Sequence, residues 1–193
     1  MKRAIVIYIV LMLLSIIVFS QHVRFGIDPG MAISRGSYKP DAGLDRRIFG
    51  GFDGGMLVEI GACPKFMIQP EANYSIVGVE LNNGSTEYTI KHSYFNIPLL
   101  AKLNVANRLN LIAGPQLGFL LTSKSDPSSG EAATDIKNQF KSTDFGLAFG
   151  GEYKFTRHIF LGARYYLGVT NISDNNDFEM KNRYASFRVG YIF

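Results

Sequence analysis

The feature that most constrains this chain is an alternation of apolar and polar residues with a period of two, repeated in eight separate segments. A period of two places alternate side chains on opposite faces of a β-strand, and no segment after residue 20 fits a helical period better. The last segment shows the pattern clearly, because Ser186, Arg188 and Gly190 separate its apolar positions, with Ile192 the exception. Its apolar set is Ala185, Phe187, Val189, Tyr191 and Phe193.

We therefore predict an all-β fold. An apolar strand at the end of the sequence would be an aggregation-prone sheet edge unless another strand paired with it. Closure of the sheet, with the last strand bonded to the first, removes that edge. The prediction is an eight-stranded antiparallel up-and-down β-barrel with strands near residues 23–34, 47–61, 65–76, 88–103, 108–121, 143–155, 158–171 and 185–193.

The beginning of the chain has the pattern of a cleavable signal peptide. Lys2 and Arg3 precede an apolar run over residues 4–19, and small or modest side chains follow before Gln21. A retained membrane anchor is the alternative, but the run is shorter than the ~20 residues that span a bilayer. We predict a signal peptide over residues 1–20 and one barrel domain over residues 21–193.

Charged residues are confined to one face of the predicted strands. A soluble lipocalin-like barrel would turn the apolar face inward, whereas a membrane barrel would turn it to lipid. Glycines and paired charges suit the narrow interior that eight strands leave, which favours the membrane barrel. The residues opposite the apolar sets are Arg24, Asp28, Asp53, Glu59, Lys65, Glu71, Lys102, Asp144, Glu152, Lys154, Arg164 and Arg188.

The links between the predicted strands are strongly unequal in length. Those after the second, fourth and sixth strands are tight, and each apolar band is about the 9–11 residues that a tilted strand needs to cross a bilayer. Short periplasmic turns and long external loops are typical of transmembrane β-barrels. The long links are predicted at residues 36–46, 77–87, 122–141 and 171–182.

Several motifs resemble a known family. They are Phe66-Met67-Ile68-Gln69-Pro70-Glu71, Asn96-Ile97-Pro98-Leu99-Leu100-Ala101-Lys102, Ala113-Gly114-Pro115, Asp144-Phe145-Gly146-Leu147, Arg164-Tyr165-Tyr166 and Gly190-Tyr191-Ile192-Phe193. With the signal peptide, they resemble the PorT-like family of outer-membrane β-barrel-domain proteins, which includes small porin-like barrels of the OmpA/OmpX type. The turn signal Asp28-Pro29-Gly30 departs from the family's uninterrupted first strand, and we expect a bulge or break there.

The resemblance implies a place in the bacterial outer membrane. It also implies contact with outer-membrane lipid and with the barrel-assembly machinery, which reads a C-terminal signal of the kind formed by Phe187, Val189, Tyr191 and Phe193. It further implies, as an alternative role, an accessory component of an outer-membrane protein secretion machine.

The inward charges predict an ion-pair network inside the barrel, because buried charges are costly unless they are paired. Counting from the tight turns places Glu59, Lys102, Glu152 and Arg188 low and Glu71 and Arg164 near mid-height. Glu71–Arg164 and Asp28–Arg188 are the expected contacts. The network fills and rigidifies the barrel in this interpretation, and a proton or small-ion path is the alternative. Its predicted members are Asp28, Glu59, Glu71, Lys102, Glu152, Arg164 and Arg188.

Signals for catalysis and cofactors are weak. The histidines are His22, His92 and His158, and no spacing gives one of them both a nucleophile and an orienting acid. The single cysteine, Cys63, excludes an intramolecular disulfide and a Cys-based metal site. We predict a non-enzyme without a cofactor or metal.

The predicted role is structural or interaction-based, exercised through the long external loops towards an envelope or secretion-system partner. A net charge of +4, reduced to +2 without Lys2 and Arg3, gives no sign of nucleic-acid binding. A small-solute or ion channel and a lipid-modifying enzyme are the remaining alternatives.

Overall fold

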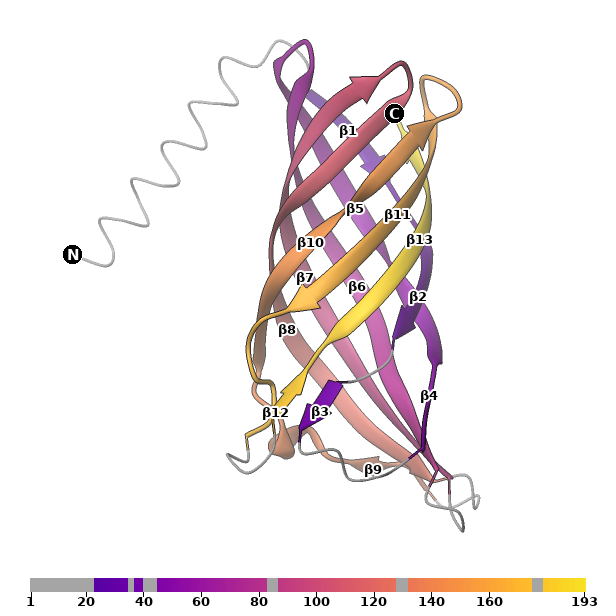
Figure 1. Ribbon diagram of the computed structural model, residues 1–193, viewed down its shortest axis with the longest axis vertical. Coiled ribbons are helices and arrows are strands. Elements are labelled where there is room, and N and C mark those ends of the chain that lie inside the picture. The colour runs from indigo at the N-terminus through magenta and orange to yellow at the C-terminus, as the bar shows by residue number, and fades with distance from the viewer. Residues whose placement is uncertain (1–22, 35–36, 40–44, 83–86, 128–131, 175–178) are drawn as a thin grey trace, which may run out of the picture.

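The computed structural model describes residues 23–34, 37–39, 45–82, 87–127, 132–174 and 179–193, which form a tall barrel of tilted strands (Figure 1). The predicted signal peptide and its cleavage site therefore lie outside the described residues. The elements are β1 (Val23–Ile27), β2 (Gly30–Ser34), β3 (Ser37–Lys39), β4 (Asp45–Arg47), β5 (Phe49–Cys63), β6 (Phe66–Asn82), β7 (Glu87–Ala106), β8 (Leu109–Pro127), β9 (Thr134–Asp135), the 3₁₀ turn η1 (Lys137–Gln139), β10 (Thr143–Lys154), β11 (Ile159–Gly168), β12 (Glu179–Lys181) and β13 (Arg183–Ile192).

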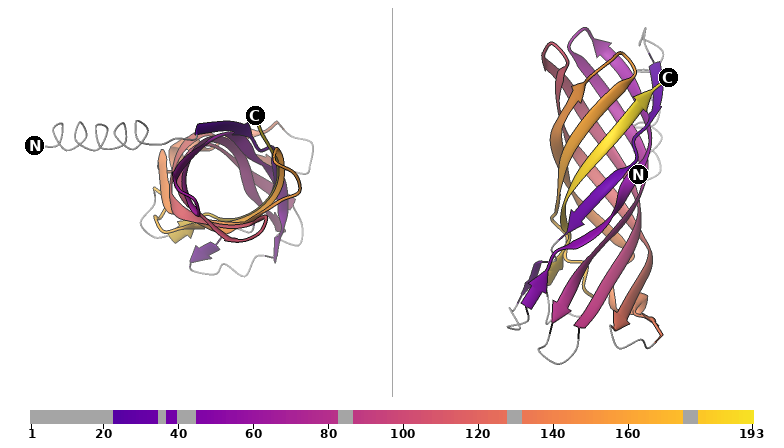
Figure 2. Two further views of the ribbon diagram at one scale, coloured as in Figure 1. Left: turned by 90° about the horizontal axis from the view of Figure 1, so that it is seen from above. Right: turned by 90° about the vertical axis from the view of Figure 1, so that its right-hand side faces the viewer.

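The main sheet is a closed antiparallel ring. The order is β5, β6, β7, β8, β10, β11 and β13, and both β1 and β2 bridge β13 to β5. The view along the barrel in Figure 2 shows the ring from above. The predicted eight-stranded up-and-down barrel is confirmed, with β1 and β2 together serving as its first strand.

The first strand is interrupted where the sequence predicts a break. Pro29 has no backbone N–H, so the ladder loses one donor at this point. Pairing nevertheless continues on both sides, because Asp28 N donates to Gly55 O at 3.0 Å and Val189 N donates to Pro29 O at 3.0 Å. The barrel is therefore closed across the interruption.

The two ends of the barrel differ. At one end, three tight turns centre on residues 64–65, 107–108 and 155–158, and β13 ends beside them. At the other end, β6, β7 and β8 project past their neighbours and the small β3–β12 sheet lies beside them. We call the end with the three tight turns the short-turn end, and the opposite end the long-loop end.

Two predictions about the links are wrong in detail. Most of residues 77–87 and the first part of 122–141 continue the strands, since β6 pairs with β7 to the end of β6 and β8 reaches Pro127. The outward face of β8 becomes polar there, as at Thr122 and Lys124, so the alternation of hydrophobicity fades while the ladder continues. Lys65, predicted to point inward, lies exposed in a tight turn.

The apolar face points outward. Leu161 and Phe187 are 45% and 56% exposed, whereas Arg164 and Glu71 are 6% and 5% exposed. The four residues of the predicted C-terminal signal, Phe187, Val189, Tyr191 and Phe193, all lie on this outer face. This is the arrangement of a membrane barrel, because water would be a poor solvent for so continuous an apolar surface.

Among the described residues, no helix is long and apolar enough to cross a membrane.

Candidate functional site

At mid-height, the interior holds a bidentate ion pair. Arg164 of β11 donates from Nη1 to Glu71 Oε2 at 2.7 Å and from Nη2 to Glu71 Oε1 at 2.9 Å, across the barrel to β6. Asn73 adds a donor to Glu71 Oε2 at 2.8 Å. A planar guanidinium fits a carboxylate in this two-bond geometry, which fixes the orientation of both groups. The arrangement brings together the pair expected from strand heights.

Arg188 of β13 binds several carboxylates at once. Its Nη1 donates to Asp28 Oδ2 at 2.7 Å, and its Nε and Nη2 donate to Asp53 Oδ2 at 3.1 and 2.5 Å. Its Nη1 also lies 3.4 Å from Glu71 Oε2. The turn count placed Arg188 low, but its long side chain reaches up into the mid-height group. Asp53, which the sequence placed inside without a partner, is a full member of this cluster.

A second cluster surrounds Lys102, nearer the short-turn end. The ammonium of Lys102 contacts Glu59 at 2.5 Å, Gln69 Oε1 at 3.0 Å and the carboxylate of Glu152. It also lies 5.3 Å from the centre of the Phe160 ring, within cation–π range. All four polar side chains are buried.

Two basic residues near the rim extend this lower cluster. Arg24 Nη2 is 2.6 Å from Glu59 Oε2, and Lys154 Nζ is 3.5 Å from Glu59 Oε1. Leu57, Phe160 and Ile192 form a buried apolar cluster. Because the Phe160 ring faces the Lys102 ammonium, this packed hydrocarbon adjoins the lower ions.

Neutral polar residues join the charged groups into one network, and our prediction from sequence missed them. Gln69 Nε2 donates to Glu71 Oε1 at 2.7 Å and to Glu152 Oε1 at 3.3 Å, which links the two clusters. Ser75 donates to Asp53 and accepts from Asn96. Each of these residues has the inward parity of its strand, and that parity was the available signal.

The interior changes character towards the long-loop end. Tyr94, Leu120, Tyr166 and Tyr184 belong to one buried apolar cluster, and the Tyr166 and Tyr184 rings lie 5.0 Å apart. Asp144 is buried beside this layer, where its carboxylate accepts from Asn182 at 2.9 Å and from Thr170 at 2.9 Å. Asp144 is thus held by neutral donors.

His92 lies beyond the apolar band, since its outward neighbours Lys91 and Ser93 are polar. Its Nδ1 is 3.0 Å from Ser123 Oγ, and the Phe140 ring packs edge-on at 4.6 Å. Burial lowers the pKa of His92 to about 4, so the ring is neutral at pH 7.

The His92–Ser123 pair has the residue types of a catalytic dyad without its surroundings. Ser123 is fully buried, and no described carboxylate is hydrogen-bonded to the His92 ring. A nucleophile must meet substrate, and its base needs an orienting partner. Of the other histidines, His158 donates from Nδ1 to Ile192 O at 2.8 Å at the short-turn end, and His22 lies outside the described residues.

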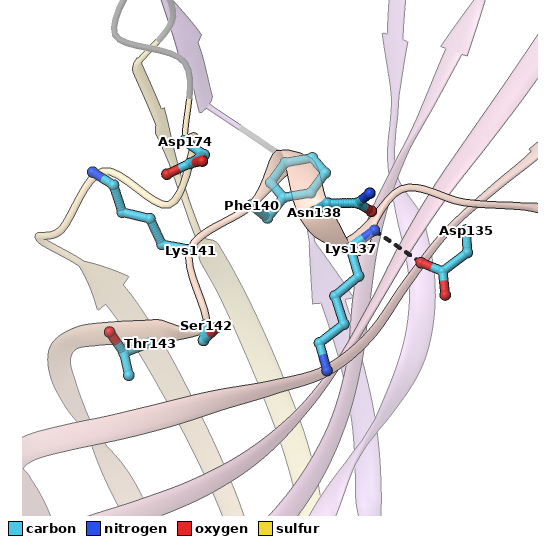
Figure 3. A pocket seen from close by; sticks show the side chains of 8 residues that line it. All are labelled: Asp135, Lys137, Asn138, Phe140, Lys141, Ser142, Thr143 and Asp174. Carbon is cyan, nitrogen blue, oxygen red and sulfur yellow. Dashed lines mark hydrogen bonds between the residues drawn. The ribbon is translucent and has the colours of Figure 1, made fainter.

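A pocket of about 750 Å³ opens at the long-loop end, beside η1 and the start of β10 (Figure 3). Figure 3 shows the half-buried Phe140 ring between Asp174 and Lys141 on one side and Lys137 and Asp135 on the other. Asp135 Oδ1 accepts the backbone N–H of Lys137 at 2.9 Å, which ties one wall together. Its lining is Asp135, Lys137, Asn138, Phe140, Lys141, Ser142, Thr143 and Asp174.

This pocket combines cations, anions, an amide, hydroxyls and an aromatic ring on one open surface. Such a lining can bind a polar ligand through several hydrogen bonds, and it contains no group that the structure activates for chemistry. Over the described residues, no group of three or more His, Cys, Asp or Glu could hold a metal ion.

Comparisons with known proteins agree on the fold. The profile of the outer membrane protein β-barrel domain family matches residues 19–174. Neisserial surface protein A is similar with a TM-score of 0.55 and 13% identity, over 89% of this chain and 98% of that one. The attachment invasion locus protein Ail of Yersinia pestis, solved with the heparin analogue sucrose octasulfate, is similar with a TM-score of 0.51 and 15% identity, over 90% and 100%. A search of curated proteins finds no matching sequence.

Proposed function

This chain belongs to the outer membrane protein β-barrel domain family and lies in the bacterial outer membrane, and we propose that it is a closed barrel that binds a partner at its long-loop end. The family membership is broader than the PorT-like resemblance. The observation that carries the proposal is the filled interior, which leaves the external rim as the surface where a ligand can be met.

Three successive layers occupy the barrel lumen. The aromatic layer around Tyr166 and Tyr184 lies towards the long-loop end, the Arg164–Arg188 layer at mid-height, and the Lys102 layer towards the short turns. About eight strands leave room only for side chains. A hydrated path for solutes would have to displace ion pairs whose desolvated charges need one another.

The rim at the long-loop end has an open polar surface that a ligand can reach, whereas the lumen is filled with side chains. Strands β6, β7 and β8 raise it beyond the apolar band, and the pocket around Lys137 and Lys141 is open and polar. Since Asp135 and Asp174 face the same space, the pocket suits a ligand with several hydrogen-bonding groups. A partner outside the cell, or a polar group of a neighbouring envelope component, meets this description.

A test of the proposal has two arms. The refolded protein in planar bilayers should give no steady conductance, because the lumen is filled. Nanodisc-embedded protein should bind at least one member of a panel of soluble saccharides and peptides. The double variant Lys137→Glu/Lys141→Glu should weaken that binding by tenfold or more, whereas Lys124→Glu, a matched exposed lysine outside the pocket, should leave it unchanged.

A steady, large conductance in the first arm would contradict the closed barrel. Equal loss of binding in the pocket variant and in Lys124→Glu would contradict the pocket, since it would show a general charge effect. Ser123 is buried and cannot meet a substrate, so its contact with His92 does not support catalysis.

The secretion-machine role implied by the PorT-like resemblance stays a prediction. No contact in the described structure favours it. Co-purification of the intact envelope complex with periplasmic secretion components would support it, and their absence from a cross-linked envelope preparation would count against it.

A further inference from the structure

The short-turn end of the barrel carries exposed basic residues, one in each tight turn. They are Lys65 between β5 and β6, Arg108 between β7 and β8, and Arg157 between β10 and β11. The residues of these turns that the structure describes include no Asp or Glu, and Glu59 and Glu152 of the adjoining strands are buried and paired. The three turns therefore present basic side chains without an acidic side chain among them.

The long-loop end is different. Lys91 and Asp126 form an ion pair at 2.6 Å, and Lys181 and Glu179 form another at 2.6 Å. The pocket is also lined by both acidic and basic residues. The one-sign charge is thus a property of the short-turn rim and not of the chain as a whole.

The basic residues lie at a definite depth. Arg108 directly precedes the lipid-facing Leu109, and Arg157 lies between the lipid-facing Phe155 and Ile159. Arg108 and Arg157 therefore lie one or two residues past the last side chains that face hydrocarbon. This is the depth at which lipid head groups lie.

An aromatic girdle marks the same level. The Tyr153 and Phe155 rings meet edge-on at 5.0 Å, as do those of Tyr191 and Phe193 at 5.5 Å, and His158 stacks on Tyr191 at 5.6 Å. Aromatic residues of this kind settle at the interface between hydrocarbon and water.

Arg108 provides an independent observation. Its φ of 76° lies in the left-handed region, and it is the one non-glycine residue with positive φ among the described residues. Glycine or asparagine would adopt this conformation with less strain. An arginine at a strained position indicates that its side chain, and not its backbone preference, is the useful property.

We propose that this basic rim, formed by Lys65, Arg108 and Arg157, binds the phosphate groups of anionic phospholipids in the periplasmic leaflet. Short turns of outer-membrane barrels face the periplasm, which places the rim in that leaflet. Each base near a membrane surface contributes up to roughly a fivefold preference for anionic over zwitterionic lipid, and salt screens the effect.

The full mature chain can be tested in bilayers of phosphatidylcholine that contain spin-labelled phosphatidylglycerol or spin-labelled phosphatidylcholine. The fraction of motionally restricted label gives the relative affinity of the barrel surface for each lipid. The wild type should favour phosphatidylglycerol several-fold at low salt, and the preference should fall at high salt. The triple variant Lys65→Gln/Arg108→Gly/Arg157→Gln should bring the ratio close to one.

Two controls make the result decisive. The matched variant Lys124→Gln/Lys137→Gln/Lys141→Gln removes three charges from the other end and should keep the wild-type ratio. Arg108→Gly alone should lower the ratio while its urea midpoint stays equal or rises, because glycine relieves the strained turn. A wild-type ratio near one, or equal losses in both triple variants, would overturn the proposal.

Discussion

Leu99 and Leu100 are neighbours in the sequence that meet different surroundings. Leu99 is 39% exposed on the outer face of β7, between the lipid-facing Val105 and Phe95, whereas Leu100 is fully buried inside. A guanidinium at mid-bilayer costs about 2–4 kcal/mol. We expect Leu99→Arg to lower the free energy of unfolding by that amount in urea titrations from lipid vesicles.

The control for this change is Ser93→Arg on the same face of the same strand. Ser93 lies past the apolar band, where the cost of a charge falls to about 0–1 kcal/mol. If Leu99→Arg costs no more than Ser93→Arg, the outer face of β7 does not lie in hydrocarbon.

Arg188 contacts three of the six buried acids among the described residues. It holds Asp28 and Asp53 and approaches Glu71. Removing one partner of a buried ion pair leaves an uncompensated charge and costs about 3–5 kcal/mol. Arg188→Met should therefore lower the free energy of unfolding by this amount in urea titrations.

The matched variant is Arg188→Met combined with Asp28→Asn and Asp53→Asn. It removes the stranded charges along with the cation, so part of the lost stability should return. An Arg188→Met protein as stable as the wild type would show that the cluster contributes no net pairing energy.

Strands β11 and β13 fit each other because a small residue faces a large one. Gly190 pairs with Phe160 in the ladder, and a Cβ added at Gly190 would lie 2.0 Å from the Phe160 ring. The ring is buried and cannot move freely, so Gly190→Ala should cost about 1–3 kcal/mol. In Phe160→Leu protein the same change should cost clearly less, and additive losses from the two substitutions would contradict this packing.

The projecting part of β7 and β8 should respond to pH through His92. Its pKa is lowered to about 4 by burial, against about 6.5 when unfolded, so the unfolded state binds more protons between these values. Stability should therefore fall as pH drops from 6.5 towards 4, by on the order of 3 kcal/mol, and change little above pH 6.5. The measurement is the urea midpoint against pH, and His92→Gln should flatten this part of the profile.

At the level of elements, the alternation predicts the strands and their facing well, because one buried face fixes the register. The alternation fails as a signal where the residues on both faces of a strand are polar. Beyond Leu121, outward residues such as Thr122 and Lys124 are polar, so the apolar pattern ends although β8 continues to Pro127, where a long loop was expected. Lys65 shows the opposite error, since an alternating pattern carried into a turn implied an inward side chain.

The candidate site could be predicted in part for the same reason. Counting residues from the tight turns predicts that Glu71 and Arg164 meet, because their Cα atoms lie at similar heights along the barrel axis. The same count misplaces Arg188, because a long side chain can bridge two levels. The pocket around Phe140 depends on how β9, η1 and the segment after β11 fold over the rim, which no period in the sequence encodes.

The whole molecule has its three interior layers in series, and this order predicts how it can be opened. Removing the upper aromatic layer with Tyr94→Ala/Tyr166→Ala/Tyr184→Ala leaves the Arg164–Glu71 pair and the Lys102 cluster across the lumen. This variant should still show no steady conductance in planar bilayers. A variant that also carries Arg164→Ala, Glu71→Ala, Lys102→Ala and Glu152→Ala loses side chains at all three levels and should conduct, provided that it refolds to a protease-resistant barrel. Conductance in the tyrosine variant alone would mean that the aromatic layer is the whole barrier, and that the ion pairs below it already admit water.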